Sequence, residues 1–578
     1  MYNIHRTLLI AKEVSSMNFP VWTKRETNSL NGVWQFKFTE SRDFDDDAVA
    51  GIEYDDLISV PCAFDATPAY NGKRGIGFYR TTLTVTPGKA ARILFGAVGM
   101  YCKVFVDRCK VGEHYAAYTP FQCELPPAVK AERELVVMVC NRFDYERYKL
   151  HENYFDFYAY GGIFRDVELQ QLPAGPLIEW VGVDTLDYKT GALQVKIKSV
   201  PGRQTLELTL DGSDRQVFQD CEFKDGQQTL ELMLKKFKPW SPEHPELHTI
   251  TVANGTDTMI VRFGVRQVWT ERGRIILNGE AVKLLGYCRH ESHPQFGPAL
   301  PLTQLIGDLQ MLRDLGCNFV RGSHYQQDPR FLSLCDELGF LVFEETLSWQ
   351  AKCKNFADPK FVAAQLYQAR SMIFSSYNNP CVIIRGFLNE GQSDAEDARA
   401  CYTALIKLFR ELDPHRLLTY ASCRVFKDLF LEQIDIISFN IYPGWYPHNP
   451  DDECPLGEIV PYIKVLQEGL RQRGLDDKPF LISEIGAGAI YGWRDPICAH
   501  WSEEYQQEYL RIVCQEVVDN DGIAGVALWQ FCDIRTYRGG YALGRPRCFN
   551  DKGTVDEFRR PKLAYNTVKT IFKGYKQQ

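Results

Sequence analysis

The chain has 578 residues, which is long enough for three or four ordinary domains, or for fewer if one of them is a large barrel. Apolar residues make up 45% and charged residues 24%, a composition that is typical of globular proteins and excludes a disordered or fibrous one. The 66 basic and 74 acidic side chains give a formal net charge of −8, and no basic run occurs. The charge pattern therefore argues against binding to nucleic acid or to an anionic membrane.

The N-terminus and the cysteines predict a cytoplasmic protein. Residues 1–16 hold only a short apolar run, which Lys12 and Glu13 end, so they do not resemble a secretory signal. No apolar stretch approaches the roughly 18 residues of a membrane span. The 18 cysteines are scattered without a CxxC pair, which predicts reduced thiols and neither a zinc cluster nor a redox motif.

The first part of the chain, to about residue 265, is predicted to be all β. Short alternating runs are bounded by Pro, Gly and Asp, and turn signals recur about every 8–12 residues. A break falls at Leu-Pro-Ala-Gly-Pro, residues 172–176. We therefore expect one β-sandwich over residues 1–172 and a second over 173–268, whose length of about a hundred residues fits an immunoglobulin-like sandwich.

Beyond residue 269 helical patterns alternate with short apolar strands. Helices are predicted over residues 302–315 and 329–338, and the alternation continues for about 300 residues, which predicts a parallel (β/α)8 barrel over 269–578. Six of the predicted strands end in polar side chains: Arg321, His324, Glu344, Glu345, Asn389, Glu390, Asn440, Tyr442, Glu484 and Trp529. Because active sites of such barrels lie at these strand ends, the pattern predicts a catalytic site there.

Two of these strand-end carboxylates are candidates for catalysis. Glu390 follows Asn389 after one predicted strand, and Glu484 ends another. Two carboxyl groups that face each other across a barrel mouth are what hydrolysis of a glycosidic bond requires. One protonates the leaving oxygen, while the other attacks the anomeric carbon or activates water.

An ordered series of motifs along nearly the whole chain resembles family 2 of the glycoside hydrolases. Asn389-Glu390 and Ser-Glu-Ile-Gly at 483–486 are similar to that family's acid/base and nucleophile motifs. Further similar motifs are Leu-Asn-Gly-Val-Trp at 30–34, Gly-Phe-Tyr-Arg at 77–80, Tyr-Thr-Pro-Phe at 118–121, Gly-Gly-Ile-Phe-Arg-Asp-Val at 161–167, Phe-Gly-Val-Arg at 263–266, Leu-Asn-Gly at 277–279 and Gly-Tyr-Cys-Arg-His-Glu at 286–291. The resemblance implies a jelly-roll β-sandwich, an immunoglobulin-like β-sandwich and a catalytic TIM barrel, with a retaining mechanism.

Within the family the β-glucuronidases are the most similar group. They carry an Asn-x-Lys segment that binds the sugar carboxylate, and Asn550-Asp-Lys552 matches it. An amide and an ammonium can give charge-assisted hydrogen bonds to a carboxylate. Asn-Asp-Lys-Gly at 550–553 would also make a good surface turn, and family members that act on neutral sugars can carry similar segments.

The resemblance also implies further contacts to the sugar. Asn389 would hold the 2-hydroxyl, Trp529 would form a platform under the ring, and Asp156 would reach a hydroxyl from the first sandwich. The remaining substrate-binding residues implied by matching segments are His324, Asn440, Tyr442 and Tyr446. Two departures from the family pattern are Arg385, where a Trp is usual, and Gly391 in place of Pro.

The sequence thus predicts a retaining exo-β-glucuronidase that acts on small glycosides. Glu484 would be the nucleophile and Glu390 the acid/base, and no metal or cofactor would be needed. The alternatives are a β-galacturonidase or β-galactosidase of the same family, and a carbohydrate-binding protein that has lost catalysis. We expect a homo-oligomer, a dimer or tetramer, with neither a nucleic-acid nor a membrane partner.

Overall fold

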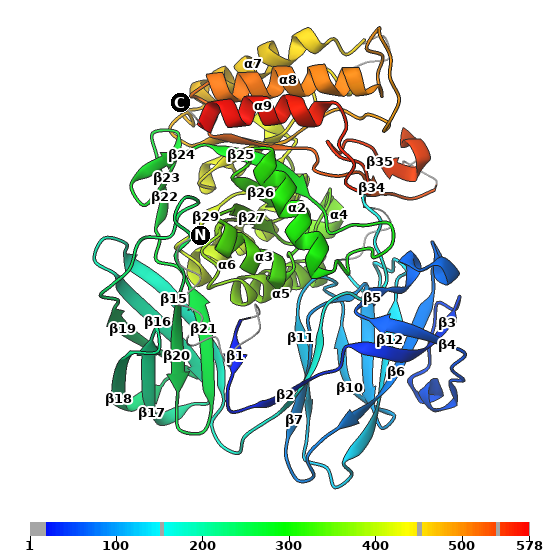
Figure 1. Cartoon of the computed structure of the whole chain (residues 1–578), viewed down its shortest axis with the longest axis vertical. Helices are drawn as coiled ribbons and strands as arrows, with labels where there is room; N and C mark the ends of the chain where they lie inside the picture. Colours follow the sequence, from blue (N-terminus) through cyan, green and yellow to red (C-terminus); the bar gives the residue numbers. More distant parts are fainter. Residues whose placement is uncertain (1–18, 151–154, 448–452, 539–543, 577–578) are drawn as a thin grey trace.

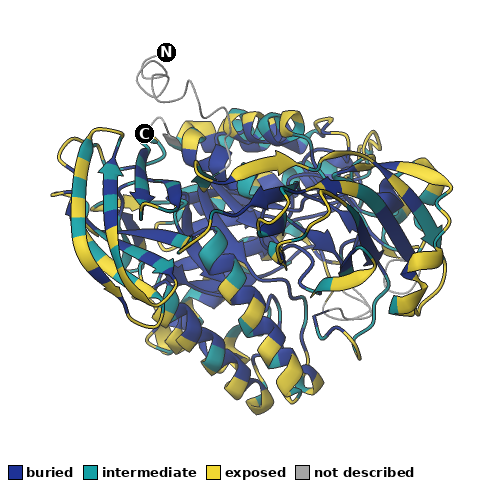
Figure 2. Cartoon of the chain, turned by 90° about the horizontal axis from the view of Figure 1, so that it is seen from below, coloured by how far each residue is buried: buried dark blue, intermediate teal, exposed yellow. Residues whose placement is uncertain are grey.

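The structure is a computed structural model that describes residues 19–150, 155–447, 453–538 and 544–576. Figure 1 shows two β regions side by side, one in blue and one in green, against a barrel that carries helices on its outside. Figure 2 shows that these helices expose one face and bury the other against the dark blue strands. In the described residues no helix is long and apolar enough to cross a membrane.

The first β region is a sandwich of antiparallel sheets. A six-stranded sheet of order β10-β9-β12-β6-β3-β4 faces a four-stranded sheet of order β11-β7-β14-β2, and β5-β13-β8 form a third. Trp34 and Phe36 alternate along β3 into the core between the sheets, as a half-buried strand requires. The strands are β2 (Glu26–Ser29), β3 (Gly32–Thr39), β4 (Asp56–Val60), β5 (Cys62–Ala63), β6 (Ile76–Thr84), β7 (Ala91–Phe95), β8 (Val98–Gly99), β9 (Tyr101–Val106), β10 (Cys109–His114), β11 (Phe121–Leu125), β12 (Glu132–Cys140), β13 (Gly162–Ile163) and β14 (Val167–Gln171).

The second β region pairs a three-stranded sheet, β15-β16-β19, with a five-stranded sheet, β1-β21-β20-β17-β18. Its first strand, β1 (Val21–Trp22), comes from the N-terminal end of the chain and pairs with Met259 and Ile260. The stretch predicted as the first sandwich therefore contributes a strand to the second one. The other strands are β15 (Ile178–Asp187), β16 (Ala192–Ser199), β17 (Gly202–Leu210), β18 (Asp214–Phe223), β19 (Gln227–Met233), β20 (His248–Ala253) and β21 (Thr258–Phe263).

The barrel is a single parallel sheet of order β29-β28-β27-β26-β25-β33-β32-β31-β30. Its two end segments, β29 and β30, are separated only by Thr419 and Tyr420, so they are two parts of one strand and the sheet closes as an eight-stranded ring. The strand segments are β25 (Leu284–Arg289), β26 (Phe319–Gly322), β27 (Leu341–Glu345), β28 (Val382–Gly386), β29 (Leu417–Leu418), β30 (Ala421–Ser422), β31 (Ile437–Asn440), β32 (Phe480–Ile485) and β33 (Gly525–Leu528).

Helices connect most of the barrel strands. The predicted helices 302–315 and 329–338 agree with α2 and α3, whereas the described link between β30 and β31 holds only two 3-10 turns, Val425–Lys427 and Leu431–Gln433. The α-helices are α2 (Leu302–Asp314), α3 (Pro329–Leu338), α4 (Cys353–Phe356), α5 (Pro359–Ser375), α6 (Arg399–Leu412), α7 (Ile459–Gln472), α8 (Glu503–Asp519) and α9 (Ala564–Lys576). The strands outside the barrel ring are β22 (Val268–Glu271), β23 (Arg274–Leu277), β24 (Glu280–Val282), β34 (Ile534–Arg535) and β35 (Phe549–Asn550).

Arg385 is fully enclosed in the barrel wall, and the structure accounts for its charge. Its guanidinium lies 2.6 Å from a carboxylate oxygen of Glu344 and 2.9 Å from one of Asp413. Although burial raises the pKa of Asp413, the guanidiniums of Arg416 and Arg385 hold it at about 2. The Arg that departs from the family pattern is therefore a buried structural ion partner, and Glu344 belongs to this network and not to the barrel mouth.

Candidate active site

Glu390 lies just beyond β28, in a tight bend at the barrel mouth. The bend gives both Leu388 and Glu390 positive φ values, 49° and 53°. Two amides hold the two carboxylate oxygens of Glu390: Asn440 Nδ2 donates to Oε1 at 3.0 Å, and Gln350 Nε2 donates to Oε2 at 3.0 Å. The carboxylate is partly exposed, so it is both fixed in place and open to a substrate.

Glu484 ends β32 on the other side of the mouth and is almost fully buried. The Arg321 guanidinium donates to its Oε1 at 2.7 Å, and the Tyr442 hydroxyl donates to its Oε2 at 2.7 Å. Burial raises the pKa of Glu484 to about 8, and the nearby charge of Glu390 also raises it, whereas Arg321 and Tyr442 oppose the rise. These contacts fix the orientation of the carboxylate, and Arg321 and Tyr442 favour its ionised form.

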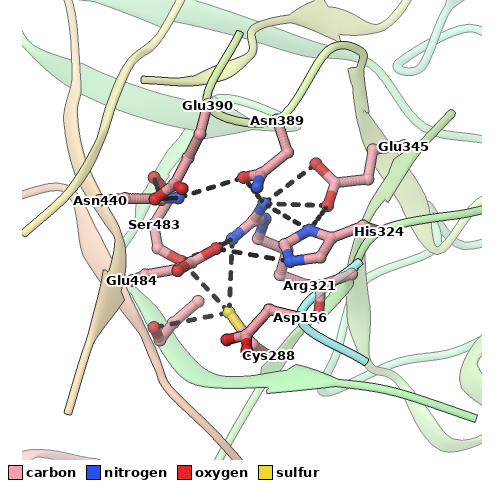
Figure 3. Close-up of polar contacts among 12 residues, drawn as sticks. Asp156, Cys288, Arg321, His324, Glu345, Asn389, Glu390, Asn440, Ser483 and Glu484 are labelled. Carbon is pink, nitrogen blue, oxygen red and sulfur yellow. Dashed lines mark hydrogen bonds and ion pairs between the residues drawn. The ribbon is translucent and has the colours of Figure 1, made fainter. Parts of the chain in front are cut away.

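Arg321 is the centre of the polar network; the sequence placed it among the strand-end polar residues but gave it no catalytic or substrate-binding role. Figure 3 shows its guanidinium among the side chains of Glu345, Asn389 and Glu484. It donates to Glu345 Oε1 at 2.9 Å and to Asn389 Oδ1 at 2.8 Å. An Arg at the end of an apolar strand, as in Asn-Phe-Val-Arg at 318–321, was the available sequence signal, because such a cation requires buried acidic partners.

His324 and Trp529 form an aromatic wall beside Glu484. Their rings stack at 5.2 Å between centroids with an interplanar angle of 17°. His324 Nδ1 is 2.9 Å from Glu345 Oε1, which orients the ring. Burial lowers the pKa of His324 well below its usual range, and the neighbouring charge of Arg321 lowers it further, so the imidazole is neutral at pH 7.

Asn440 connects the two catalytic candidates, because it bonds directly to Glu390 and also to Ser483, the residue before Glu484. Its Nδ2 donates to Glu390 and also to Asn389 Oδ1 at 3.1 Å, while its Oδ1 accepts from Ser483 Oγ at 2.8 Å. Every polar atom of the Asn440 side chain thus has a partner, and the side chain is 4% exposed. This amide is a rigid support for Glu390.

Lys552 lies inside a group of aromatic rings that includes Tyr442, the hydroxyl partner of Glu484. Its Nζ donates to the Tyr446 hydroxyl at 2.8 Å and lies 4.8, 5.2 and 5.7 Å from the ring centroids of Tyr446, Trp445 and Tyr442. The residue is 1% exposed. Burial lowers the pKa of Lys552 well below its ordinary value, and the charge of Arg545 lowers it further.

Asn550 and Asp156 complete this side of the site. The Arg545 guanidinium donates to Asp156 Oδ2 at 2.6 Å, and Asn550 Nδ2 donates to the same oxygen at 3.2 Å. The buried Oδ1 of Asn550 has no hydrogen-bond partner within the described residues. Asp156 comes from the first β region, so that region contributes directly to the barrel mouth.

The structure brings together all of the predicted site residues that lie in its described ranges. They are Asp156, His324, Asn389, Glu390, Asn440, Tyr442, Tyr446, Glu484, Trp529, Asn550 and Lys552. Asp156 was predicted from its resemblance to a family loop over residues 154–157, of which Tyr154 lies outside the described residues. Arg547 forms ion pairs with Glu557 and with Asp551, the middle residue of the Asn-x-Lys segment, and so helps to hold that segment in place.

Two family models match the chain. The one described as "Glycosyl hydrolases family 2, TIM barrel domain" matches residues 268–576, and "Glycosyl hydrolases family 2, sugar binding domain" matches residues 27–173. A β-glucuronidase from Streptococcus agalactiae is 24% identical over 96% of this chain and 97% of its own length. A β-galactosidase from Thermoanaerobacterium thermosulfurigenes is 29% identical over 83% of this chain and 66% of its own.

Solved structures of similar proteins have the same fold over nearly their whole length. A family 2 β-galacturonidase from Eisenbergiella tayi, bound to galacturonate, superimposes with a TM-score of 0.86 at 34% identity, covering 96% of this chain and 99% of that one. A β-glucuronidase from Bifidobacterium dentium superimposes with a TM-score of 0.85 at 21% identity, covering 95% and 97%.

Proposed function

The chain belongs to family 2 of the glycosyl hydrolases, and from this premise we propose that it removes a terminal β-linked hexuronic acid from small glycosides with retention of configuration. One observation carries the choice of an acidic sugar. Lys552 is a buried basic side chain without a carboxylate partner in the described part of the chain, where its hydrogen bond goes to the Tyr446 hydroxyl. A buried charge without a counter-ion is costly, and a sugar carboxylate would be the missing partner.

The proposed mechanism is a double displacement. Glu484 attacks the anomeric carbon while Glu390 protonates the leaving oxygen, and Glu390 then takes a proton from the water that releases the sugar. Arg321 and Tyr442 support this assignment of the nucleophile, because both favour the ionised carboxylate of Glu484. Glu390 suits the acid/base role because it is the more exposed of the two and can reach a leaving group.

The neighbouring side chains would bind the glycone. Asn389 keeps a buried Nδ2 that has no partner in the described residues, and we assign it to the sugar 2-hydroxyl. The stacked pair His324 and Trp529 would form the wall under the ring. Asn550 would donate to the carboxylate together with Lys552, through the second N–H of an Nδ2 whose first N–H goes to Asp156.

Of the two C4 epimers, we place β-galacturonide first and β-glucuronide second. The solved neighbour with 34% identity over nearly the whole chain is described as a β-galacturonidase, whereas the β-glucuronidase relative from Streptococcus agalactiae is 24% identical. The β-glucuronide predicted from the sequence stays a candidate because the two sugars share the C6 carboxylate on which the proposal rests.

A panel of 4-nitrophenyl β-glycosides tests the proposal. We expect galacturonide and glucuronide to exceed galactoside, glucoside and mannoside in kcat/KM by about 10- to 150-fold, the value of one charge-assisted contact of roughly 1.5–3 kcal/mol. Product analysis by NMR should show the β-anomer of the free sugar first. Equal turnover of galactoside and both uronides would contradict an acidic substrate, and an α-anomer as first product would contradict retention.

A further inference from the structure

Gln350 contacts the acid/base candidate from a loop that no motif singled out. The loop follows β27, and its backbone is fastened to the strand-end bend: Gln350 N donates to Asn389 O at 2.9 Å, and Trp349 forms a parallel bridge with Asn389. From this position the side-chain amide donates to Glu390 Oε2 at 3.0 Å. Gln350 is therefore held beside the carboxylate by main-chain contacts that do not depend on its side chain.

The two amides on Glu390 differ in how firmly they are held. Asn440 is buried, and both ends of its side chain have further partners in Asn389 and Ser483. Gln350 is partly exposed, and within the described residues its only side-chain hydrogen bond is the one to Glu390. Asn440 therefore fixes Oε1 from the buried side, and the partly exposed Gln350 holds Oε2.

An amide N–H bonds more strongly to a carboxylate than to a carboxylic acid, because the bond is then charge-assisted. During the first step the proton leaves Glu390 for the leaving oxygen, and the carboxylate becomes negative. The Gln350 bond strengthens at the same time, and an interaction that is stronger in the transition state than in the ground state raises the rate. The gain is largest for a poor leaving group, because its departure requires the most proton transfer.

We propose that Gln350 is a positioning residue for the acid/base Glu390 and that it promotes departure of the leaving group. This inference rests on the proposed function, since it assumes that Glu390 protonates the glycosidic oxygen. Gln350 would then be a residue outside the Asn389-Glu390 motif that assists protonation of the leaving oxygen. Gln350 itself gives and takes no proton.

The experiment compares Gln350→Leu with wild type on a series of aryl β-uronides of similar size, from 2,4-dinitrophenyl to phenyl. We expect kcat/KM to change little for the most activated substrate and to fall about 10-fold for phenyl, so that the rate depends more steeply on leaving-group acidity. A merely structural role would lower kcat/KM for all substrates by the same factor. The thermal midpoint of each variant reports whether the fold is intact.

Gln392→Leu is the matched control. Gln392 lies two residues after Glu390 and ties the same two loops together, since its Oε1 accepts from Cys353 N at 2.9 Å, but it has no hydrogen bond to Glu390. We expect its loss to leave the leaving-group dependence unchanged. Three outcomes for Gln350→Leu would overturn the inference: the same loss in kcat/KM for every substrate, no loss for any, or a loss that follows the size of the aryl group.

The two proposals fail separately. If wild type prefers a neutral glycoside, the uronide proposal is wrong, and the same aryl series on the preferred sugar still decides the role of Gln350. If wild type hydrolyses uronides and Gln350→Leu shows an unchanged leaving-group dependence, the uronide proposal stands and the inference on Gln350 is wrong.

Discussion

Replacing Lys552 by Met removes one charge and keeps most of the apolar stem. In the described structure the Nζ of Lys552 is buried among Tyr442, Trp445 and Tyr446 and donates to a hydroxyl. If a sugar carboxylate is its partner, the variant loses a desolvated charge-assisted contact of roughly 1.5–3 kcal/mol. The expected loss in kcat/KM on uronides is therefore about 10- to 150-fold, with a further loss if the ring is no longer oriented over Glu484.

The assay measures kcat and KM of Lys552→Met on 4-nitrophenyl β-galacturonide, β-glucuronide and β-galactoside. For the galactoside, kcat/KM should stay the same or rise, because this sugar has no carboxylate to pair with Lys552 and the variant removes a buried charge. Arg547→Met is the matched control: it removes another cation of the same segment, one that is paired with Asp551 and Glu557, and should affect all three substrates alike. An equal loss of charged and neutral substrates in Lys552→Met would refute carboxylate recognition.

The same lysine gives a pH dependence whose sign can be worked out. Burial and Arg545 lower the pKa of Lys552, so the side chain loses its charge at a lower pH than an exposed lysine. The attraction to a carboxylate is present below this pKa and is lost as the pH rises through it. KM for uronides should therefore rise on the alkaline side in wild type, while KM for the galactoside stays flat. A parallel rise for both would exclude Lys552 as the cause.

Further variants test the catalytic pair and its supports. In Glu484→Gly, azide should restore turnover and give a glycosyl azide of inverted configuration. Glu390→Ala should keep activity on substrates with good leaving groups, and azide should then give a glycosyl azide of retained configuration. The reverse pattern would exchange the two roles. Arg321→Gln should move the acid limb of kcat/KM to higher pH, because Arg321 lowers the pKa of Glu484, which must be ionised to attack; an unmoved limb would exclude this role. Arg385→Met should destabilise the fold by about 3–5 kcal/mol, because it leaves buried Glu344 without its cation and Asp413 with Arg416 alone, and thermal unfolding without a shift would contradict this account.

The sequence was informative wherever chain order alone determines position. In a parallel barrel all strands end at the same mouth, so polar residues at strand ends must gather there wherever the strands lie in the ring. This places Glu390, Glu484 and Asn440 in one site before any contact is known. The helix limits were also predictable, because apolar spacing and the Asp-Pro pair that begins α3 are local features.

What the sequence could not predict depends on contacts between distant segments. Arg321 bonds to Glu345 and Glu484 on two other strands, and those partners follow from the register of the closed ring. The pairing of Arg545 with Asp156 joins residues 389 positions apart in two different regions. Gln350 is a single amide in a loop, and neither spacing nor composition distinguishes it from the other glutamines. The pairing of β1 with the second sandwich has the same long-range origin.

The basic side chains of the site divide into two groups that serve different purposes. Arg321 and Arg545 each have a carboxylate partner in the described structure, so they hold Glu484, Glu345 and Asp156 in place and would be little changed by a ligand. Lys552 has a hydroxyl and aromatic rings around it, and a ligand carboxylate would complete its charge balance. A neutral sugar would leave this cation buried and unpaired, or would require it to lose its proton. On this argument selectivity for an acidic sugar arises as much from the penalty against neutral sugars as from attraction to the carboxylate.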